Sequence, residues 1–224
     1  MRAFENWFTQ DVEDKLGLVQ IDIFDPLTDW LTVTPEPEKY DERNLNRLTQ
    51  SLKNNADFWN EDELKLNFIA PLLFMVTPWA APYKPFSQRR LRAVVNDIEI
   101  GGIVDYMIAQ GRQIPKKPIF CLHEYKQEAK RDTDPKGQLL AEMAAAQETN
   151  ADGRPIYGCY VIGRLVFFIV LHGAEYGVSL AYDGTKMPEL LDILAILEKL
   201  KTYLPPAESA NTKTARNQAV LAVQ

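Results

Sequence analysis

The sequence has few of the residues that build disulfide frameworks or zinc sites. It contains two cysteines and two histidines in 224 residues. Cys121 and Cys159 each stand inside an apolar, strand-like run, so we expect buried, reduced thiols. His123 and His172 have no metal-ligand spacing to each other or to the cysteines. A disulfide scaffold and a zinc site are therefore not expected.

The sequence also lacks a long apolar run. The longest ones, such as residues 165–171, are far too short to span a bilayer core of about 30 Å. The amino-terminal stretch MRAFENWFTQDVED turns acidic at once and has no signal-peptide apolar region. We therefore expect a cytoplasmic protein that does not contact the membrane.

Positive charge is scarce overall but locally concentrated. The chain has 25 basic and 31 acidic residues, a net charge of -6, which argues against a non-specific nucleic-acid binder. Residues 84–131, however, hold ten basic and five acidic residues, which leaves -11 for the rest of the chain. This basic segment is a candidate phosphate-binding face, and a solvated loop rim is the alternative. Its basic residues are Lys84, Arg89, Arg90, Arg92, Arg112, Lys116, Lys117, Lys126, Lys130 and Arg131.

The composition, with 46% apolar and 25% charged residues, is that of an ordinary globular protein. Its length predicts one domain over residues 1–204, with an amino-terminal extension (1–58) and a core (59–204). Residues 205–224 are expected to form a mobile tail.

Hydrophobic periodicity predicts the order of helices and strands. Residues 25–37 carry three prolines and predict connecting structure with a short strand at 30–33. The predicted helices are 1–18, 40–52, 60–75, 136–149 and 188–203, and the predicted strands are 18–24, 91–95, 98–100, 103–109, 119–126, 156–162, 166–172 and 176–182. Asn60 and Glu63 predict a capping box at the start of the second long helix, and Pro71 lies inside that helix.

Charged residues end two apolar runs within residues 101–126, GGIVDYMIAQGRQIPKKPIFCLHEYK. Strand alternation predicts two sets of residues that each share a face: Ile103, Asp105 and Met107 in one, and Phe120, Leu122, Glu124 and Lys126 in the other. Two carboxylates and a lysine at the ends of buried strands are costly unless a metal, a partner or a substrate compensates them.

These residues follow a recognisable order: Glu63 on a helix, Asp105 on one strand, Glu124-Tyr125-Lys126 on the next, and Gln138 on the following helix. The order resembles the PD-(D/E)XK nuclease superfamily over residues 60–172. Locally, ELKLNFIAPLL at residues 63–73 is similar to the amino-terminal nuclease region of type I restriction enzyme subunits. The resemblance implies an α/β (mixed α+β) fold with a restriction-endonuclease-like core, in which helices flank a central mixed sheet.

By this resemblance, Asp105 and Glu124 would bind a divalent cation, Mg²⁺ or Mn²⁺, which prefer oxygen ligands. The backbone carbonyl of Tyr125 would complete the protein share of the shell, and Glu63 would hold a metal-bound water or a second ion. Lys126 would orient the attacking water and neutralise charge on the phosphate.

Gln138 would contact either the site or the DNA backbone. The sequence departs from the family pattern at two positions. Val104 stands where the motif name has proline, and Glu142 stands where related members carry tyrosine four residues after the glutamine. The expected activity is metal-dependent hydrolysis of DNA, in restriction or defence. A catalytically silent fold that binds nucleic acid or protein is the alternative, as is a subunit of a restriction or mobile-element system. Each carboxylate also has an ordinary structural explanation, such as a cap or an ion pair, and a homodimer stays open.

Overall fold

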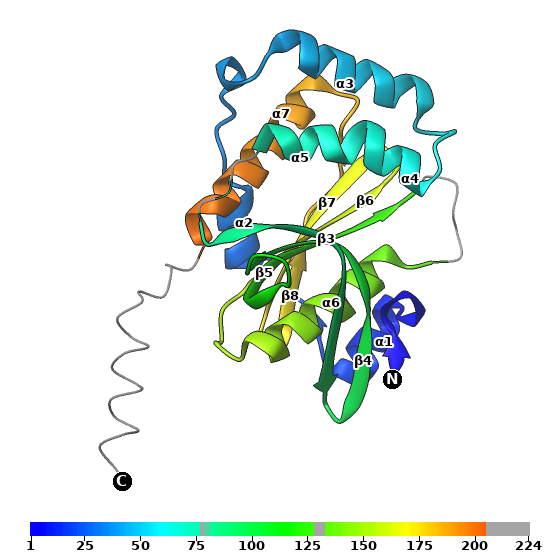
Figure 1. Ribbon diagram of the computed structural model, residues 1–224, viewed down its shortest axis with the longest axis vertical. Helices are drawn as coiled ribbons and strands as arrows, with labels where there is room; N and C mark the ends of the chain where they lie inside the picture. Colours follow the sequence, from blue (N-terminus) through cyan, green and yellow to red (C-terminus); the bar gives the residue numbers. More distant parts are fainter. Residues whose placement is uncertain (77–78, 80, 128–132, 205–224) are drawn as a thin grey trace.

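The computed structural model describes residues 1–76, 79, 81–127 and 133–204, with only the backbone at 121 and 122 (Figure 1). The predicted tail at 205–224 lies outside the described residues. So do Lys130 and Arg131 of the basic segment.

Helices and strands alternate irregularly along the chain. The α-helices are α1 (Thr9–Leu16), α2 (Asp25–Leu31), α3 (Glu42–Asn55), α4 (Glu61–Leu64), α5 (Ala70–Val76), α6 (Pro135–Asn150) and α7 (Met187–Lys199). Shorter helical turns are η1 (Phe4–Asn6), η2 (Pro37–Lys39), the π-helical turn η3 (Lys65–Ile69) and η4 (Leu200–Tyr203). The strands are β1 (Arg2–Ala3), β2 (Val19–Gln20), β3 (Tyr83–Val95), β4 (Ile98–Gln110), β5 (Lys116–Lys126), β6 (Ile156–Ile162), β7 (Leu165–His172), β8 (Glu175–Val178) and β9 (Tyr182–Asp183).

In the described residues these strands form one mixed sheet, with the order β1-β4-β5-β6-β7-β8-β2 and with β3 and β9 paired to β4 and β7. The β5–β6 pair is parallel, and α6 connects its two strands as the crossover. The β3–β4 pair is antiparallel and turns at Asn96 and Asp97, which both have the positive φ that tight hairpin turns require. The chain is thus a mixed α/β protein with a central sheet flanked by helices.

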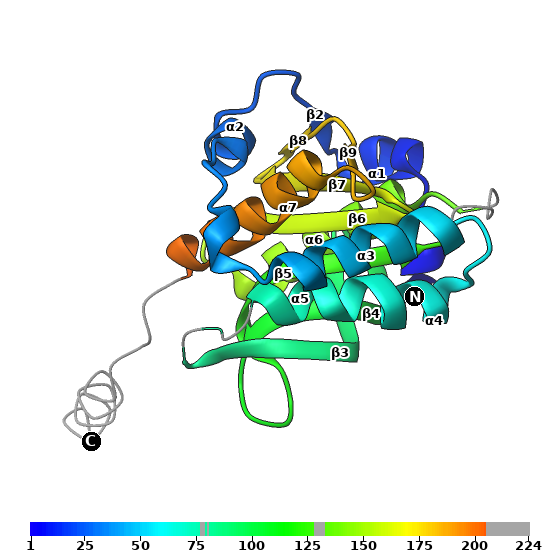
Figure 2. The same cartoon turned by 90° about the horizontal axis from the view of Figure 1, so that it is seen from above.

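Each face of the sheet carries its own hydrophobic core. On one face lie α2, α3, α5 and α7 (Figures 1 and 2), where Trp30 donates its indole N–H to the carbonyl of Ile196 at 2.9 Å. On the other face α6 packs with α1 and η1, and Phe4, Trp7 and Val12 are buried there. Residues 1–58 therefore contribute large side chains to both cores.

The long periodic elements were predicted correctly, including helices α3, α6 and α7 and the strands β6 and β7. The structure corrects the less regular segments. Residues 25–31 form helix α2, not connecting structure, because Pro26 suits the first turn of a helix and Leu27 and Trp30 pack into the core. The predicted helix at 1–18 is divided into β1, η1 and α1, and the predicted strand at 18–24 is limited to β2.

The predicted face assignments around the charged residues were wrong in two places. Ile103 is 52% exposed whereas Met107 is 1% exposed, because Val104 and Met107 both contact the α6-side core and strict alternation breaks between them. In β5, Phe120 and Ile119 pack in opposite cores. The pairing of β5 with β4 shifts register at Ile108–Ala109, so the alternation of side chains is not kept from Phe120 to Glu124. Irregular pairing therefore surrounds the ends of both strands.

Two composition-based predictions can also be compared with the structure. The thiol of Cys159 is free and buried, as expected, and burial raises its pKa. The side chain of Cys121 lies outside the described part of the chain. None of the helices described here is long and apolar enough to cross a membrane.

Candidate active site

A gap in the sheet brings the candidate site residues together. On one edge β4 pairs with β5 from Gln110 back to Tyr106, and further along the same edge with β1 at Gly101 and Ile100. Asp105 lies in the unpaired stretch between them. Its Oδ2 accepts a hydrogen bond from the backbone N–H of Tyr125 at 3.2 Å, in place of a strand-to-strand bond.

Asp105 is held by two further donors. Lys65 Nζ lies 2.8 Å from its Oδ1, and Gln88 Nε2 lies 2.7 Å from the same oxygen. Gln88 has a φ of 52°, a left-handed conformation that a non-glycine residue rarely adopts. Backbone strain of this kind is concentrated at functional sites, and here it points an amide at Asp105.

Glu124 is the more deeply buried of the two predicted metal ligands. Its side chain is 1% exposed, Oε1 accepts a hydrogen bond from Lys126 Nζ, and Oε2 has no hydrogen-bond partner among the described residues. Burial, and after it the negative charge of Asp105, raises the pKa of Glu124 to about 8, although Lys126 opposes the shift. Burial lowers the pKa of Lys126, but its acidic neighbours outweigh that effect and hold it above the usual value.

Helix α6 packs against β5 and carries two buried polar side chains, Gln138 and Glu142. Asp134 caps this helix by accepting from the backbone N–H of Gly137 at 2.9 Å. In the next turn Gln138 Nε2 donates to Glu142 Oε1 at 3.2 Å, and both side chains are buried. Burial raises the pKa of Glu142, and the negative charge of Glu124 raises it further.

The helix before β3 supplies Glu61 and Lys65, not Glu63. The capping box was predicted correctly: Asn60 Oδ1 accepts from the N–H of Glu63, and Glu63 Oε2 accepts from the N–H of Asn60, both at 2.9 Å. Glu63 is exposed and its carboxylate is engaged at its own helix end. Its predicted catalytic role is therefore not supported by its position.

Glu61 instead links the two lysines of the site. Its Oε1 lies 2.7 Å from Lys65 Nζ and its Oε2 lies 3.7 Å from Lys126 Nζ. Lys65 is the first residue of the π-helical turn that precedes Pro71. π-Turns of this kind are frequent at functional sites, and here one stands at the residue that binds Asp105.

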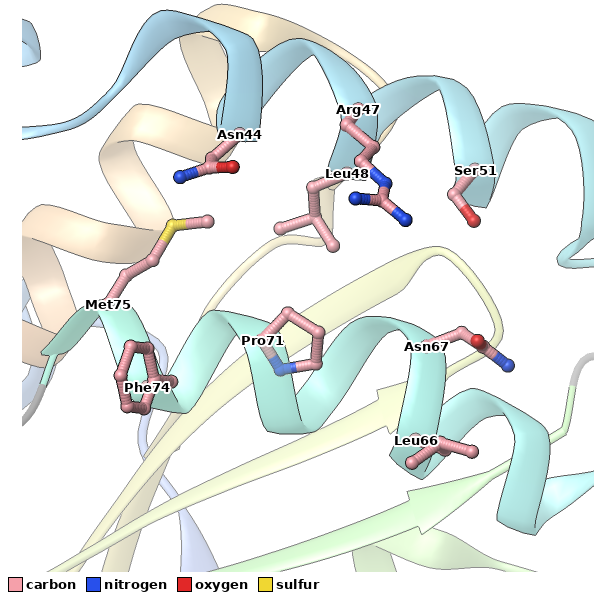
Figure 3. Close-up of a pocket in the computed structure, with 9 residues that line it drawn as sticks. All are labelled: Asn44, Arg47, Leu48, Ser51, Leu66, Asn67, Pro71, Phe74 and Met75. Atoms are coloured by element: carbon pink, nitrogen blue, oxygen red, sulfur yellow. The ribbon is translucent and has the colours of Figure 1, made fainter.

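A hollow of about 680 Å³ opens onto Asp105. Charged and polar groups form one side of it, and Ile69, Leu73 and Phe74 form an apolar wall. A second hollow, of about 440 Å³, lies between α3 and the η3–α5 segment (Figure 3). Arg47 and Leu66 line this second hollow, and none of the predicted site residues does.

His123 and Tyr125, the neighbours of Glu124 in the chain, lie on the face of the sheet that α2, α3, α5 and α7 cover. Tyr125 OH and His123 Nδ1 are 2.8 Å apart, and the His123 ring lies 4.8 Å from that of Tyr106. Burial lowers the pKa of His123 to about 3, so the ring is neutral. The structure thus gives His123 a packing role, and the predicted use of the Tyr125 carbonyl as a metal ligand stays a prediction.

The carboxylates suit a hard divalent cation in chemistry, but two of them are already paired with ammonium groups. Within the described ranges, no three Asp, Glu, His or Cys side chains form a group that could hold a metal ion. The feature that fits a cation is the buried oxygen of Glu124 that has no partner. The ammonium groups of Lys65 and Lys126 form ion pairs with Asp105 and Glu124, so an incoming cation would compete with these lysines for the carboxylates.

Comparisons with known proteins do not identify a family for this chain. The sequence matches no family model, and no curated protein is similar to it. The functional argument therefore depends on the site itself.

The sequence interpretation missed Lys65, Gln88, Glu61 and Glu142. Lys65 and Glu61 are separated from Asp105 by about forty positions, and nothing local distinguishes them. Glu142 did carry a signal, since it stands among Leu139, Met143 and other apolar residues of a helix that is buried almost all round. A charged residue in such a helix is rare unless a partner compensates it.

Proposed function

We propose that the chain is a nuclease that hydrolyses DNA phosphodiester bonds with Mg²⁺ or Mn²⁺. The observation that carries the proposal is the meeting of Asp105, Glu124 and Lys126 at a gap in the sheet. This is the arrangement that the resemblance to PD-(D/E)XK nucleases implies. Asp105 lines a hollow, and the buried Glu124 and Lys126 lie beside it, an arrangement that suits a phosphate and a cation together.

In this proposal the carboxylates and the lysines of the site have different roles. Asp105 and Glu124 hold the cation, which lowers the pKa of water and stabilises negative charge on the phosphate when it is bound. Lys126 moves its ammonium from Glu124 Oε1 towards the attacking water and the phosphate oxygens. Lys65 provides a second positive charge beside Asp105.

The approach of DNA is supported by the basic segment. Arg89, Arg90 and Arg92 are exposed along β3, and Arg112, Lys116 and Lys117 are exposed at the junction of β4 and β5. Positive charge on these adjoining strands would attract a phosphate backbone towards the gap. A cytoplasmic nuclease of a restriction or defence system is the setting that we propose.

The test is cleavage of plasmid and linear DNA with Mg²⁺, with Mn²⁺ and with chelator, by the wild type and by the Asp105→Ala and Lys126→Ala variants. Metal-dependent cleavage that both variants lose would support the proposal. Cleavage that persists in both variants would show that the activity comes from elsewhere.

A second candidate is a catalytically silent fold that binds nucleic acid or a protein partner. It is favoured by one observation: Asp105 and Glu124 already have the ammonium groups of Lys65 and Lys126 as partners. Calorimetry separates the two candidates. Tight Mn²⁺ binding that depends on Asp105 would argue against a purely structural cluster, and no measurable binding would favour the silent fold.

A further inference from the structure

The hollow that opens onto Asp105 is large enough for a group of a bound substrate. Its volume, about 680 Å³, falls within the roughly 300–1,000 Å³ usual for ligand pockets. Asp105 lines it together with Lys65 and Gln88, the two side chains that donate to the Asp105 carboxylate. A group seated in the hollow therefore contacts the same side chains as the proposed cation and phosphate site.

An apolar wall distinguishes this hollow from a simple phosphate site. Ile69, Leu73 and Phe74 of η3 and α5 form the wall. Ile69 is buried and Leu73 is half-buried, whereas Phe74 is 80% exposed. An exposed aromatic ring beside a polar site offers a surface on which another flat ring can stack.

The charged side chains of the hollow favour a neutral occupant. Glu61, Asp62 and Asp105 line it, and Lys65 is the one basic side chain among its described lining residues. A phosphate inside the hollow would meet more negative than positive charge, so its place is at the edge. A nucleobase is neutral, and it combines two apolar faces with a polar edge that suits the Ser87 hydroxyl in the lining.

Strand β3 continues from the hollow into the basic segment. Ser87 and Gln88 line the hollow, and Arg89 and Arg90 come next along the strand and are exposed. Phosphates beside a seated base would lie near this positive charge. An intact duplex, in contrast, keeps its bases stacked inside and presents sugar and phosphate. Basic residues that follow the backbone and an aromatic ring for a base are the two parts of single-strand recognition.

We propose that the hollow binds an unpaired nucleobase, with Phe74 as the stacking surface, so that the substrate is single-stranded or locally unpaired DNA. This role rests on the proposed function, because the phosphate next to the seated base is the one that the cation at Asp105 would hold. The hollow then selects the strand state of the substrate, for which the carboxylates and lysines of the site have no preference.

The experiment measures the binding of three fluorescent probes by anisotropy, in chelator and at one salt concentration. The probes are an oligothymidylate, the same strand paired with oligoadenylate, and an abasic strand of equal length. The abasic strand carries the same phosphates without bases, so it removes the occupant of the hollow and keeps the charge.

The variants are Phe74→Ala, Phe74→Tyr and the control Leu66→Ala, with folding checked by circular dichroism. Leu66 is a matched control because it is 71% exposed and belongs to the same helical segment (Figure 3). It lines the second hollow and not the one at Asp105.

Phe74→Ala is expected to weaken oligothymidylate binding at least about fivefold, the lower end for the loss of one stacked base. Its binding of the duplex and of the abasic strand should stay within about twofold of the wild type, because neither places a base in the hollow. Phe74→Tyr keeps an aromatic ring, and Leu66→Ala leaves the hollow intact, so both are expected to bind all three probes as the wild type does.

Equal binding of the oligothymidylate by Phe74→Ala and the wild type would overturn the base-binding role. An equal loss for all three probes, or an equal loss in Leu66→Ala, would overturn it as well. No measurable binding of the single strand by the wild type would also overturn it, and would favour another occupant, such as an apolar side chain of a protein partner.

These outcomes are separate from those of the proposed function, because the binding measurements need neither metal nor cleavage. Metal-dependent cleavage that Asp105→Ala abolishes would leave the nuclease proposal standing even if Phe74→Ala changes nothing. Single-strand binding that depends on Phe74, without any cleavage by the wild type, would support the role of the hollow and overturn the nuclease proposal.

Discussion

Asp105 accepts hydrogen bonds from three different parts of the chain, and Lys65 is the one charged donor among them. Removing that ammonium leaves a carboxylate that is largely buried and no longer neutralised. We predict that Lys65→Gln lowers the free energy of unfolding by about 1–3 kcal/mol in chelator, the usual effect of losing a hydrogen bond to a charged group. Urea unfolding measures the change.

The matched control for this prediction is Lys39→Gln, which breaks an exposed ion pair with Glu36. Exposed pairs contribute little, so its effect should stay below about 0.5 kcal/mol. Equal stabilities for the two variants would contradict the role given to Lys65.

The burial of Glu124 makes stability depend on pH in a definite direction. Its folded pKa, about 8, exceeds the usual 4.5, so at pH 6 the folded chain holds a proton that the unfolded chain has released. Stability is therefore full below about pH 4.5 and falls as pH rises towards 8. Glu142, whose pKa is also raised, acts in the same direction.

We predict that Glu124 contributes about 2 kcal/mol to the unfolding free energy that the metal-free wild type loses between pH 6 and pH 8. Glu124→Gln cannot titrate and should flatten this slope. Urea unfolding at both pH values in chelator measures it, and equal slopes in the two proteins would show that Glu124 is not the titrating group.

At the scale of single residues, the sequence predicted those site residues that interrupt a local hydrophobic pattern. Asp105, Glu124 and Lys126 were found because they interrupt apolar strand runs. Lys65 and Gln88 were not, because they reach Asp105 across 40 and 17 positions and nothing in their own neighbourhood requires it.

At the scale of elements, Glu63 carries two predictions, and its position supports only one of them. The capping box was predicted correctly, whereas the catalytic role of Glu63 stays a prediction that its place at the helix end does not support. We predict that Glu63→Ala costs about 0.5–1 kcal/mol of stability and leaves DNA cleavage within about twofold of the wild type. Thermal unfolding and the plasmid assay measure the two effects, and a loss of cleavage without a loss of stability would restore the catalytic role.

The start of α6 is fixed by an unusually close contact with α1. A Cβ on Gly137 would lie 2.4 Å from backbone atoms of Phe8 and Thr9. Asp134 caps both helices, since its Oδ2 accepts from the N–H of Thr9 at 2.6 Å and its Oδ1 from the N–H of Gly137. This junction positions Gln138 and Glu142 under β5.

We predict that Gly137→Ala destabilises the protein by about 3 kcal/mol, the upper range for an overpacked site, because backbone atoms cannot move aside as a side chain can. Lys136→Ala, one residue earlier, should change stability by less than about 0.5 kcal/mol. Thermal unfolding of both variants measures the difference, and similar melting temperatures would show that α1 and α6 can separate at no cost.

Elements with strong periodicity were predictable because one apolar face decides them, as in α3, where Leu45, Leu48 and Leu52 are buried. Helix α2 was not, because its proline and polar residues are typical of a loop, and only the packing of Trp30 in the core stabilises a helix there. The break in alternation at Asp105 depends on the pairing of one edge of β4 with two different strands, β1 and β5, which no local pattern encodes.

At the scale of the whole molecule, α3 lies along the top of the view in Figure 1, and α5 lies between it and β3, the strand that carries Arg89, Arg90 and Arg92. We predict that replacing Arg112, Lys116 and Lys117 by Gln weakens DNA binding and reduces the slope of log affinity against log salt by up to about 0.9 per lost phosphate contact. Arg43→Gln on α3 is the control and should leave the slope unchanged. Binding titrations at several salt concentrations measure it, and an unchanged slope in the triple variant would place the DNA elsewhere.

The lysines in the sheet gap give the protein its own counter-ions. Lys65 and Lys126 lie within ion-pair distance of Asp105 and Glu124, so we expect the chain to fold in chelator as it does with metal. Such a protein can be synthesised, stored and carried through metal-poor conditions in an inert but intact form. Activity would then follow the supply of divalent ions, while the amount of folded protein would not.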